Sequence, residues 1–569
     1  MRFPIFPVLL SLLLLAVAPL SAQEATGEAG TQGEEGAAFF ESVDVRVVNV
    51  DVYVTDKDGN PVTGLTRDDF EILENKRPVA ITNFYAVESG TPVAGAPAEP
   101  EEADAPPGRR RTTLPRIPEE QRLHLIIYVD NFNIRPFNRN RVFRRVREFL
   151  NDHVDRNDRV MLISYDRSLH VRHPFTSDPA LVANALFDLE KLTGFGVHHD
   201  SEWRDILRAV NEAESISEAE WRVTSYAESR YNDLLFTIDA LQELIGTLGG
   251  LDGRKALLYV SDGLSMSPGE EFYHLLLNRF SQPSIMARAR DYHLGSRFQK
   301  LADFAGTNRV VFYTIDAGGL RTSISTSVEI QNPGPAGQAS FLDQIYISNL
   351  QSPLRFLADE TGGLSILNTN DVGPGLDRVA KDFDTYYSLG YSPSHVGDGR
   401  LYRIDVELKN KPKGWDVRHR EAYRDKSVYT RMADITNSTL LYGYYQNPMD
   451  VAVKVGSASP ADKRGQYHVD LQVEIPMAKV VMVPQQKFHV GRLKLFFSAM
   501  DEDGDTSDVA EVPLQLRIPN EEIDRARQAS YRYSTRLLMR SGGHRIAVGV
   551  RDEIGAVNSF VIQSLRIGS

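Results

Sequence analysis

Apolar runs of strand length alternate with helical patterns through the middle of the chain. The runs lie at residues 123–129, 160–165, 256–260 and 310–315, with a shorter strand expected at 363–367. A short run that is apolar on both faces suits a strand covered by helices on either side. Helical spacing of apolar residues is found within 139–154, 178–192, 203–246 and 376–383. The alternation predicts βαβ crossovers and a doubly wound, mostly parallel sheet within residues 122–385.

Both flanks of this region carry period-two patterns instead. Residues 40–87 hold short alternating segments around turn residues, and residues 386–425 alternate again. Such alternation predicts half-buried strands of antiparallel sheet. Because 40–87 is too short for a stable sandwich, we expect 386–425 to complete it, with the α/β domain inserted between the two halves. Residues 426–569 show the same pattern and predict a C-terminal β-sandwich.

The first residues indicate export. Arg2 precedes an apolar stretch, and Leu20-Ser21-Ala22 offers a small-residue cleavage site, so residues 1–22 are predicted to be a signal peptide. Residues 23–39 are rich in Gly, Ala, Glu and Gln and predict a disordered leader. Residues 88–121 contain seven prolines and few groups that could form a core, which is typical of a linker. We expect a periplasmic or extracellular protein with no membrane span after cleavage.

Composition excludes several classes of function. The 569 residues have a formal net charge of -13, which argues against a nucleic-acid surface because binding to phosphates needs a basic patch. The chain has no cysteine, so thiol nucleophiles and cysteine-ligated metals are excluded. The arginines of residues 139–147 are interpreted as the solvated face of a helix.

Acidic residues follow the predicted parallel strands. Asp130, Asp262 and Asp316 each come at or directly after the end of an apolar run. Ligands of such sheets bind beyond the carboxyl ends of the strands. The sequence therefore predicts a binding site at Asp130, Asn131, Asn133 and Asp262.

The order of these segments resembles a family of exported bacterial proteins described as VWFA-related. The likeness is carried by Val52–Asp56, Val62–Leu65, Asp69-Phe70, Ile126–Asp130, Asp158–Val160, Leu257–Gly263, Leu357-Ala358, Thr361–Gly363 and Tyr386–Pro393. It covers about residues 40–425, and it implies a von Willebrand factor A-type (VWA), Rossmann-like sheet with flanking β-sandwich segments.

Many VWA domains hold a divalent cation through an Asp-x-Ser-x-Ser motif, a loop Thr and a second Asp. Here Asp130 and Asp262 match the carboxylates, but Phe132 and Ile134 stand at the two Ser positions, and residues 194–200, an expected exposed loop, contain no Thr. The resemblance thus implies a degenerate site in which Asp130 and Asp262 are the candidate ligands of Mg²⁺ or another divalent cation. The alternative is that both carboxylates cap helix N-termini or bind loop amides.

The first hypothesis for function is a non-enzymatic binding or scaffold protein whose sheet edge contacts a protein partner. The second is an envelope hydrolase or processing enzyme, although no known hydrolase motif is present. The third is a structural envelope module that assembles with itself. The sequence leaves the partner and the oligomeric state open.

Overall fold

The computed structural model describes residues 47–94, 122–154, 158–321, 336–443 and 445–568. The predicted signal peptide 1–22 and leader 23–39 lie outside these ranges. The chain divides into two compact units. We call Arg46–Leu248 with Asp252–Ser427 the sheet unit, and Val428–Ser569 with Gly249–Leu251 the C-terminal unit. Within the described ranges, no helix combines the length and the apolar character needed to cross a bilayer.

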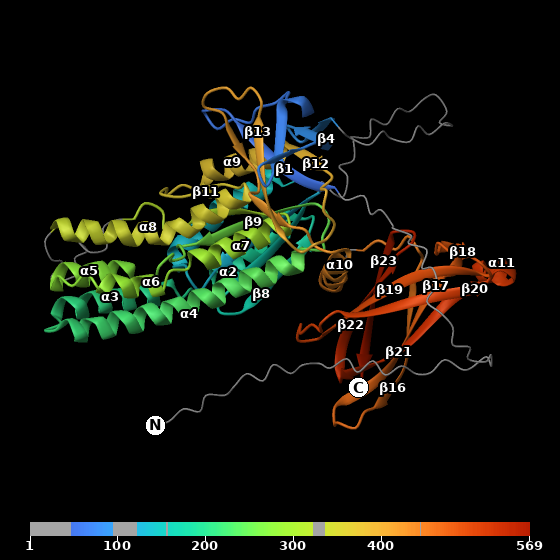
Figure 1. The fold of residues 1–569 in the computed structure, drawn as a ribbon. Coiled ribbons are helices and arrows are strands. Elements are labelled where there is room, and N and C mark those ends of the chain that lie inside the picture. Colours follow the sequence, from blue (N-terminus) through green and yellow to red (C-terminus); the bar gives the residue numbers. More distant parts are fainter. Residues whose placement is uncertain (1–46, 95–121, 155–157, 322–335, 444, 569) are drawn as a thin grey trace. The chain divides into compact units, whose positions relative to one another are not determined.

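A six-stranded sheet forms the centre of the sheet unit (Figure 1). Its spatial order is β11 (Ser365–Ile366), β10 (Val310–Asp316), β9 (Arg254–Ser261), β6 (Leu123–Asp130), β7 (Arg159–Tyr165) and β8 (Leu169–Thr176). All neighbours are parallel except β7 and β8, which are antiparallel. Every residue of β6 and β9 is buried, so the apolar runs mark strands covered on both faces. The expected mostly parallel sheet is confirmed; the edge strand β8 was not predicted.

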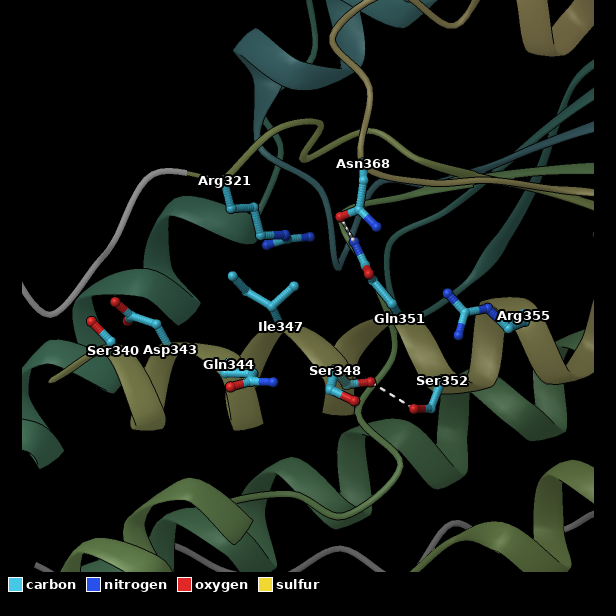
Figure 2. A pocket seen from close by; sticks show the side chains of 10 residues that line it. All are labelled: Arg321, Ser340, Asp343, Gln344, Ile347, Ser348, Gln351, Ser352, Arg355 and Asn368. Atoms are coloured by element: carbon cyan, nitrogen blue, oxygen red, sulfur yellow. Dashed lines mark hydrogen bonds between the residues drawn. The ribbon is translucent and has the colours of Figure 1, made fainter. Parts of the chain in front are cut away.

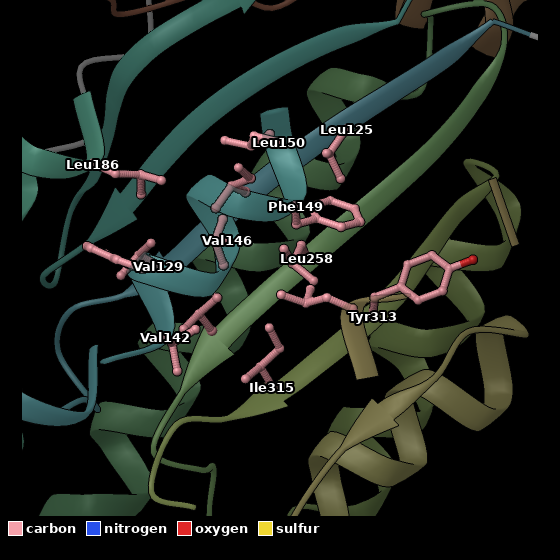
Figure 3. Close-up of a cluster of buried hydrophobic side chains, with 14 of the residues drawn as sticks. Leu125, Val129, Val142, Val146, Phe149, Leu150, Leu186, Leu258, Tyr313 and Ile315 are labelled. Atoms are coloured by element: carbon pink, nitrogen blue, oxygen red, sulfur yellow. The ribbon is translucent and has the colours of Figure 1, made fainter. Parts of the chain in front are cut away.

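Helices α1 (Pro136–His153), α2 (Pro179–Glu190) and α9 (Gly373–Asp384) cover one face of this sheet. Figure 3 shows Val142, Val146 and Phe149 of α1 packed against the strand residues that point to the same side. Helices α7 (Gly295–Thr307) and α8 (Ala336–Thr361) contact β10. Two helical layers around a parallel sheet leave the ends of the strands as the edge open to ligands.

A helical bundle lies beside the sheet and was not anticipated in this form. The predicted helical stretch 203–246 is two helices, α3 (Gly196–Glu212) and α4 (Ile216–Leu248). Together with α5 (Glu270–Phe280), α6 (Ile285–Asp291) and the start of α8, they enclose a second core around Trp203 and Phe272 (Figure 1). His198, His199 and Asp200, expected in a loop, lie in the first turns of α3.

The small sandwich of the sheet unit is built from segments on both sides of the α/β region. One sheet has the order β14 (Asp416–Arg418), β1 (Val48–Thr55), β12 (Tyr386–Tyr391), β4 (Ile81–Glu88) and β5 (Thr91–Ala94). The other has the order β15 (Ala422–Arg424), β13 (Leu401–Leu408), β2 (Phe70–Glu74) and β3 (Arg77–Val79). Strand β12 lies between β1 and β4, and β13 pairs with β2, so the two halves share one core. Residues 91–94 of the predicted linker 88–121 form β5, and residues 95–121 lie outside the described ranges.

The C-terminal unit begins with a helix, α10 (Val428–Tyr442), rather than a strand. Three strands form one antiparallel sheet, β16 (Ala452–Pro460), β17 (Gln466–Pro476) and β21 (Ser530–Arg540). The second sheet has β18 (Val483–Gln485), β19 (Phe488–Asp501), β20 (Ala510–Pro519), β22 (Gly542–Asp552) and β23 (Val557–Ile567), and a short helix α11 (Ile523–Arg527) precedes β21. Alternate residues of both sheets fill one core, as the period-two pattern indicated.

Candidate functional site

The carboxyl ends of three parallel strands meet at one edge of the central sheet. Strand β6 ends at Asp130, β10 ends at Asp316, and Asp262 directly follows β9. Asn133 links the ends of β6 and β9, because its N–H donates to Asp130 Oδ1 (3.0 Å) and its carbonyl oxygen accepts from the Asp262 N–H (3.2 Å). The fold therefore brings together acids that are 132 positions apart in the sequence, from 130 to 262.

Asp130 is fully buried beneath this edge. Its Oδ2 accepts hydrogen bonds from the hydroxyl of Tyr259, from Asn133 Nδ2 (2.9 Å) and from Ser261 Oγ (3.3 Å). Burial raises the pKa of Asp130, and these hydrogen bonds oppose the rise. The side chain thus ties β6 to β9 and to the turn after β6.

Asp262 holds the N-terminus of α1. Its Oδ2 accepts from the backbone N–H and from Nε of Arg135, both at 3.0 Å, and Asn138 Nδ2 donates to the same carboxylate at 2.9 Å. Burial raises the pKa of Asp262 even though Arg135 and Arg321 act to lower it. This geometry matches the alternative in which the carboxylate satisfies a helix N-terminus.

The two asparagines also point into the protein. Asn131 Nδ2 donates to the carbonyl of Thr193 (2.7 Å), and Asn131 Oδ1 accepts from Arg139 (2.6 Å). Asn133 Oδ1 accepts from Arg230 of α4 (3.1 Å).

The four residues predicted to bind a partner, Asp130, Asn131, Asn133 and Asp262, are at most 8% exposed. Their polar atoms have hydrogen-bond partners inside the fold, which removes the cost of burying them. They form the floor of the edge, and their contact with a partner stays a prediction.

Arginines occupy the space around these acids. Arg135 contacts Asp262, and Arg321 donates to Asp316 Oδ1 (2.8 Å) and to the carbonyl of Asp262. Phe132 and Ile134, at the two hydroxyl positions of the metal motif, are buried apolar side chains. A divalent cation would have to displace Arg135 from Asp262 and the hydroxyl and amide donors from Asp130, so these residues do not fit the cation that the resemblance implies.

Exposed apolar side chains lie on the chain segments next to Arg135 and Arg321. Phe137 is 78% exposed, Leu320 is 61% exposed, and Val197 and Phe195 are 53% and 44% exposed. The segment with Phe195 and Val197 is fixed to the turn after β6, because the N–H of Gly196 donates to the carbonyl of Ile134 (3.1 Å). We call Arg135, Phe137, Phe195, Val197 and Leu320 the rim surface. Sequence reasoning missed it because no periodicity distinguishes these apolar residues from core residues.

A polar pocket of about 450 Å³ lies between Arg321 and α8 (Figure 2). Its wall is made of Arg321, Ser340, Asp343, Gln344, Ile347, Ser348, Gln351, Ser352, Arg355 and Asn368. Gln351 Nε2 donates to Asp316 Oδ2 (2.7 Å) and to Asn368 Oδ1 (2.9 Å). The pocket therefore adjoins the acid at the end of β10 and extends the edge of the sheet with polar groups.

A serine and a histidine meet in a second pocket, of about 410 Å³. Ser267 Oγ lies 2.8 Å from His293 Nδ1, and both residues line this pocket. A hydrolase would need a third group that orients the histidine. Within the part of the chain that the structure describes, no carboxylate forms a hydrogen bond or ion pair with His293.

No family model and no curated protein matches this chain. Solved structures give weak likenesses. An aerotolerance-related membrane protein from Bacteroides fragilis is 11% identical, with 46% of this chain and 98% of that chain covered and a TM-score of 0.23. The hypothetical protein BatB from Bacteroides thetaiotaomicron is 11% identical, with 46% and 96% covered and a TM-score of 0.20. Three N-terminal domains of the type V pili tip protein Mfa5 from Porphyromonas gingivalis are 8% identical, with 91% and 76% covered and a TM-score of 0.22. At these TM-scores the likenesses carry no information about what this chain binds.

Proposed function

We propose that this chain is an exported, non-enzymatic binding protein that contacts a protein partner through the rim surface of a VWA-like sheet. The exposed apolar side chains on the segments next to Arg135 and Arg321 are the observation that carries the proposal. Large apolar groups that face solvent together at a ligand-binding edge are typical of protein interfaces. Aromatic side chains and arginine are also the residues that contribute most to such interfaces.

The buried acids have a supporting role in this proposal. Asp262 fixes the start of α1 and thereby places Phe137, while Arg135 stays 31% exposed at its side chain and keeps a donor near the surface. The partner then meets a preorganised surface, which limits the entropy lost on binding. The acidic net charge of -13 favours a protein over a nucleic acid as the partner.

Substituting Phe137 with serine should weaken partner binding by at least about tenfold, because the substitution removes an apolar anchor. Binding is measured by photo-crosslinking in the native envelope, with a benzophenone amino acid in place of Leu320, followed by mass spectrometry of the adducts. The Phe137→Ser change in that crosslinking chain should suppress the adduct.

Trp221 provides the matched control, because it is 69% exposed on α4 but lies nine residues before Arg230, about 13 Å along the helix. A benzophenone at position 221 should give no partner adduct, and Trp221→Ser should leave the adduct from position 320 unchanged. Equal adducts from both positions would contradict the proposal. An adduct with twice the mass of the chain would instead support the self-assembling module.

Removal of divalent cations should not change partner binding at the rim surface. Arg135 already pairs with Asp262, and Tyr259, Asn133 and Ser261 already donate to Asp130, so EDTA should leave the edge intact. The crosslinking yield from position 320 is compared with and without EDTA in the buffer. If EDTA abolished the adduct and Mg²⁺ restored it, the result would contradict a cation-independent contact and would support a contact bridged by a metal ion.

The hydrolase alternative can be tested at Ser267. A fluorophosphonate probe that labels the folded chain, but not a Ser267→Ala variant, would support that alternative. We expect no labelling, because His293 has no orienting carboxylate among the described residues.

A further inference from the structure

Three carboxylates converge on one histidine in the small sandwich, far along the chain from the residues of the rim surface. His395 lies in the connection between β12 and β13. Its Nδ1 is 2.9 Å from Asp425 Oδ2, and its Nε2 is 3.2 Å from Glu74 Oε1. Asp398 reaches the same space, so that one ligand atom each from His395, Asp398 and Asp425 lies within 4.8 Å of the other two.

Neighbouring tyrosines fix the orientation of these groups. The hydroxyls of Tyr391 and Tyr423 donate to Glu74 Oε1 at 2.7 and 2.8 Å, and the hydroxyl of Tyr402 donates to Asp398 Oδ2 at 2.6 Å. The Tyr402 ring stacks on the His395 ring with 3.6 Å between centroids and 6° between planes. Metal sites commonly hold their ligands through an outer layer of hydrogen bonds of this kind.

The local charge favours an added cation. Glu74, Asp398 and Asp425 lie around the His395 ring, and the guanidinium of Arg400 is 3.8 Å from Asp398 and 81% exposed. A dication bound among these carboxylates would reduce the repulsion between them.

We propose that His395, Asp398 and Asp425 bind a Zn²⁺ ion, with water as the remaining ligand. Imidazole and carboxylate are suitable zinc ligands, and tetrahedral bonds of about 2.0 to 2.2 Å place neighbouring ligand atoms about 3.3 to 3.6 Å apart. His395 Nδ1 and Asp425 Oδ2 are 2.9 Å apart, so a shift of about half an ångström brings them to this spacing.

Glu74 completes the arrangement as a positioning residue. When Nδ1 binds the ion, Nε2–H donates to Glu74, which is the carboxylate–histidine–metal arrangement found at many zinc sites. Binding releases the Nδ1 proton to water, because only the unprotonated nitrogen is a ligand. Asp398 is exposed and gives the ion and its water a path from solvent. The ion would join β2, the β12–β13 connection and the end of β15.

The test uses the full chain, stripped with EDTA, dialysed and titrated with ZnSO₄ in a calorimeter. We expect one equivalent of zinc to bind with micromolar or tighter affinity. The Asp398→Asn variant should bind at least tenfold more weakly while its metal-free melting temperature stays within 1 °C of the parent, because asparagine keeps an oxygen that accepts from Tyr402. His395→Ala should abolish the stoichiometric binding.

His198 supplies the matched control. It forms a surface pair with Glu202 at 3.1 Å on α3. Among the described residues, no second carboxylate lies close enough to His198 and Glu202 to complete a set of three metal ligands. His198→Ala should bind zinc as the parent does. The proposal is overturned if the parent takes up no stoichiometric zinc, if Asp398→Asn binds as tightly as the parent, or if His198→Ala loses the binding. Uptake of Mn²⁺ but not Zn²⁺ would overturn the assignment of the ion.

Discussion

Replacing Arg254 with methionine is expected to lower the free energy of unfolding of the sheet unit by about 3 to 5 kcal/mol, since each unpaired buried carbonyl costs about 1 to 3 kcal/mol. Arg254 is 5% exposed at the start of β9. Its guanidinium donates to the carbonyls of Asp382 (3.0 Å) and Phe383 (3.3 Å) and lies 3.5 Å from the centroid of the Tyr386 ring. The substitution leaves both carbonyls without this donor and removes the cation from the ring.

Tryptophan fluorescence during urea unfolding measures this loss selectively, because all three tryptophans, Trp203, Trp221 and Trp415, belong to the sheet unit. Arg254→Lys should lose less, since it keeps the charge but not the planar fork of donors. The control is Arg77→Met, at the exposed first residue of β3, with a change within about 0.5 kcal/mol. If Arg254→Met lowered the free energy of unfolding by less than 1 kcal/mol, the contacts of Arg254 with α9 and Tyr386 would contribute little to stability.

A Glu271→Gln variant should be more stable than the parent at pH 8, by about 3 kcal/mol, and equally stable near pH 4. Glu271 is buried in the helical bundle, where Trp203 Nε1 donates to its Oε1 (2.9 Å). Burial raises the pKa of Glu271 from 4.5 to about 7. The folded state therefore binds a proton that the unfolded state releases between these two values.

The stabilisation from this protonation is fully present below pH 4.5 and is lost as the pH rises through 7. Glutamine stays neutral and keeps an oxygen for Trp203, so the variant should not show this loss. Urea midpoints from tryptophan fluorescence at pH 4, 6 and 8 measure the difference. Glu228→Gln, at an exposed position of α4, is the control and should follow the parent at every pH. A parent and a Glu271→Gln variant with parallel pH profiles would contradict the raised pKa.

The contact of Arg254 with α9 has a counterpart in Arg418. Arg418 of β14 donates to both carboxylate oxygens of Asp382, at 2.6 and 3.0 Å. Helix α9 is thus joined to the central sheet and to the small sandwich by two arginines. A displacement of α9 would have to break buried, charged hydrogen bonds, so the two parts of the sheet unit are expected to move together.

Arg139 shows where sequence pattern fails. The arginines of residues 139–147 were interpreted as a solvated helix face, yet Arg139 is fully buried. It donates to Asn131 Oδ1 and to the carbonyls of Glu190 and Leu192. Periodicity identifies which side of α1 is charged, but not which turn of α1 the α2–α3 connection covers.

The sequence by itself determined the mostly parallel sheet and the acids at its edge, because strand burial and strand ends follow from local patterns of apolar and polar residues. Only the tertiary structure decided what those acids contact. Arg321 is 59 positions from Asp262, Arg230 is 97 positions from Asn133, and His395 is 321 positions from Glu74. Which strands become neighbours depends on packing of the whole sheet unit, so partners separated by such distances leave no periodic signal. The same packing buried Asp130 and Asp262, left the apolar side chains of the rim surface exposed, and placed His395 next to three acids.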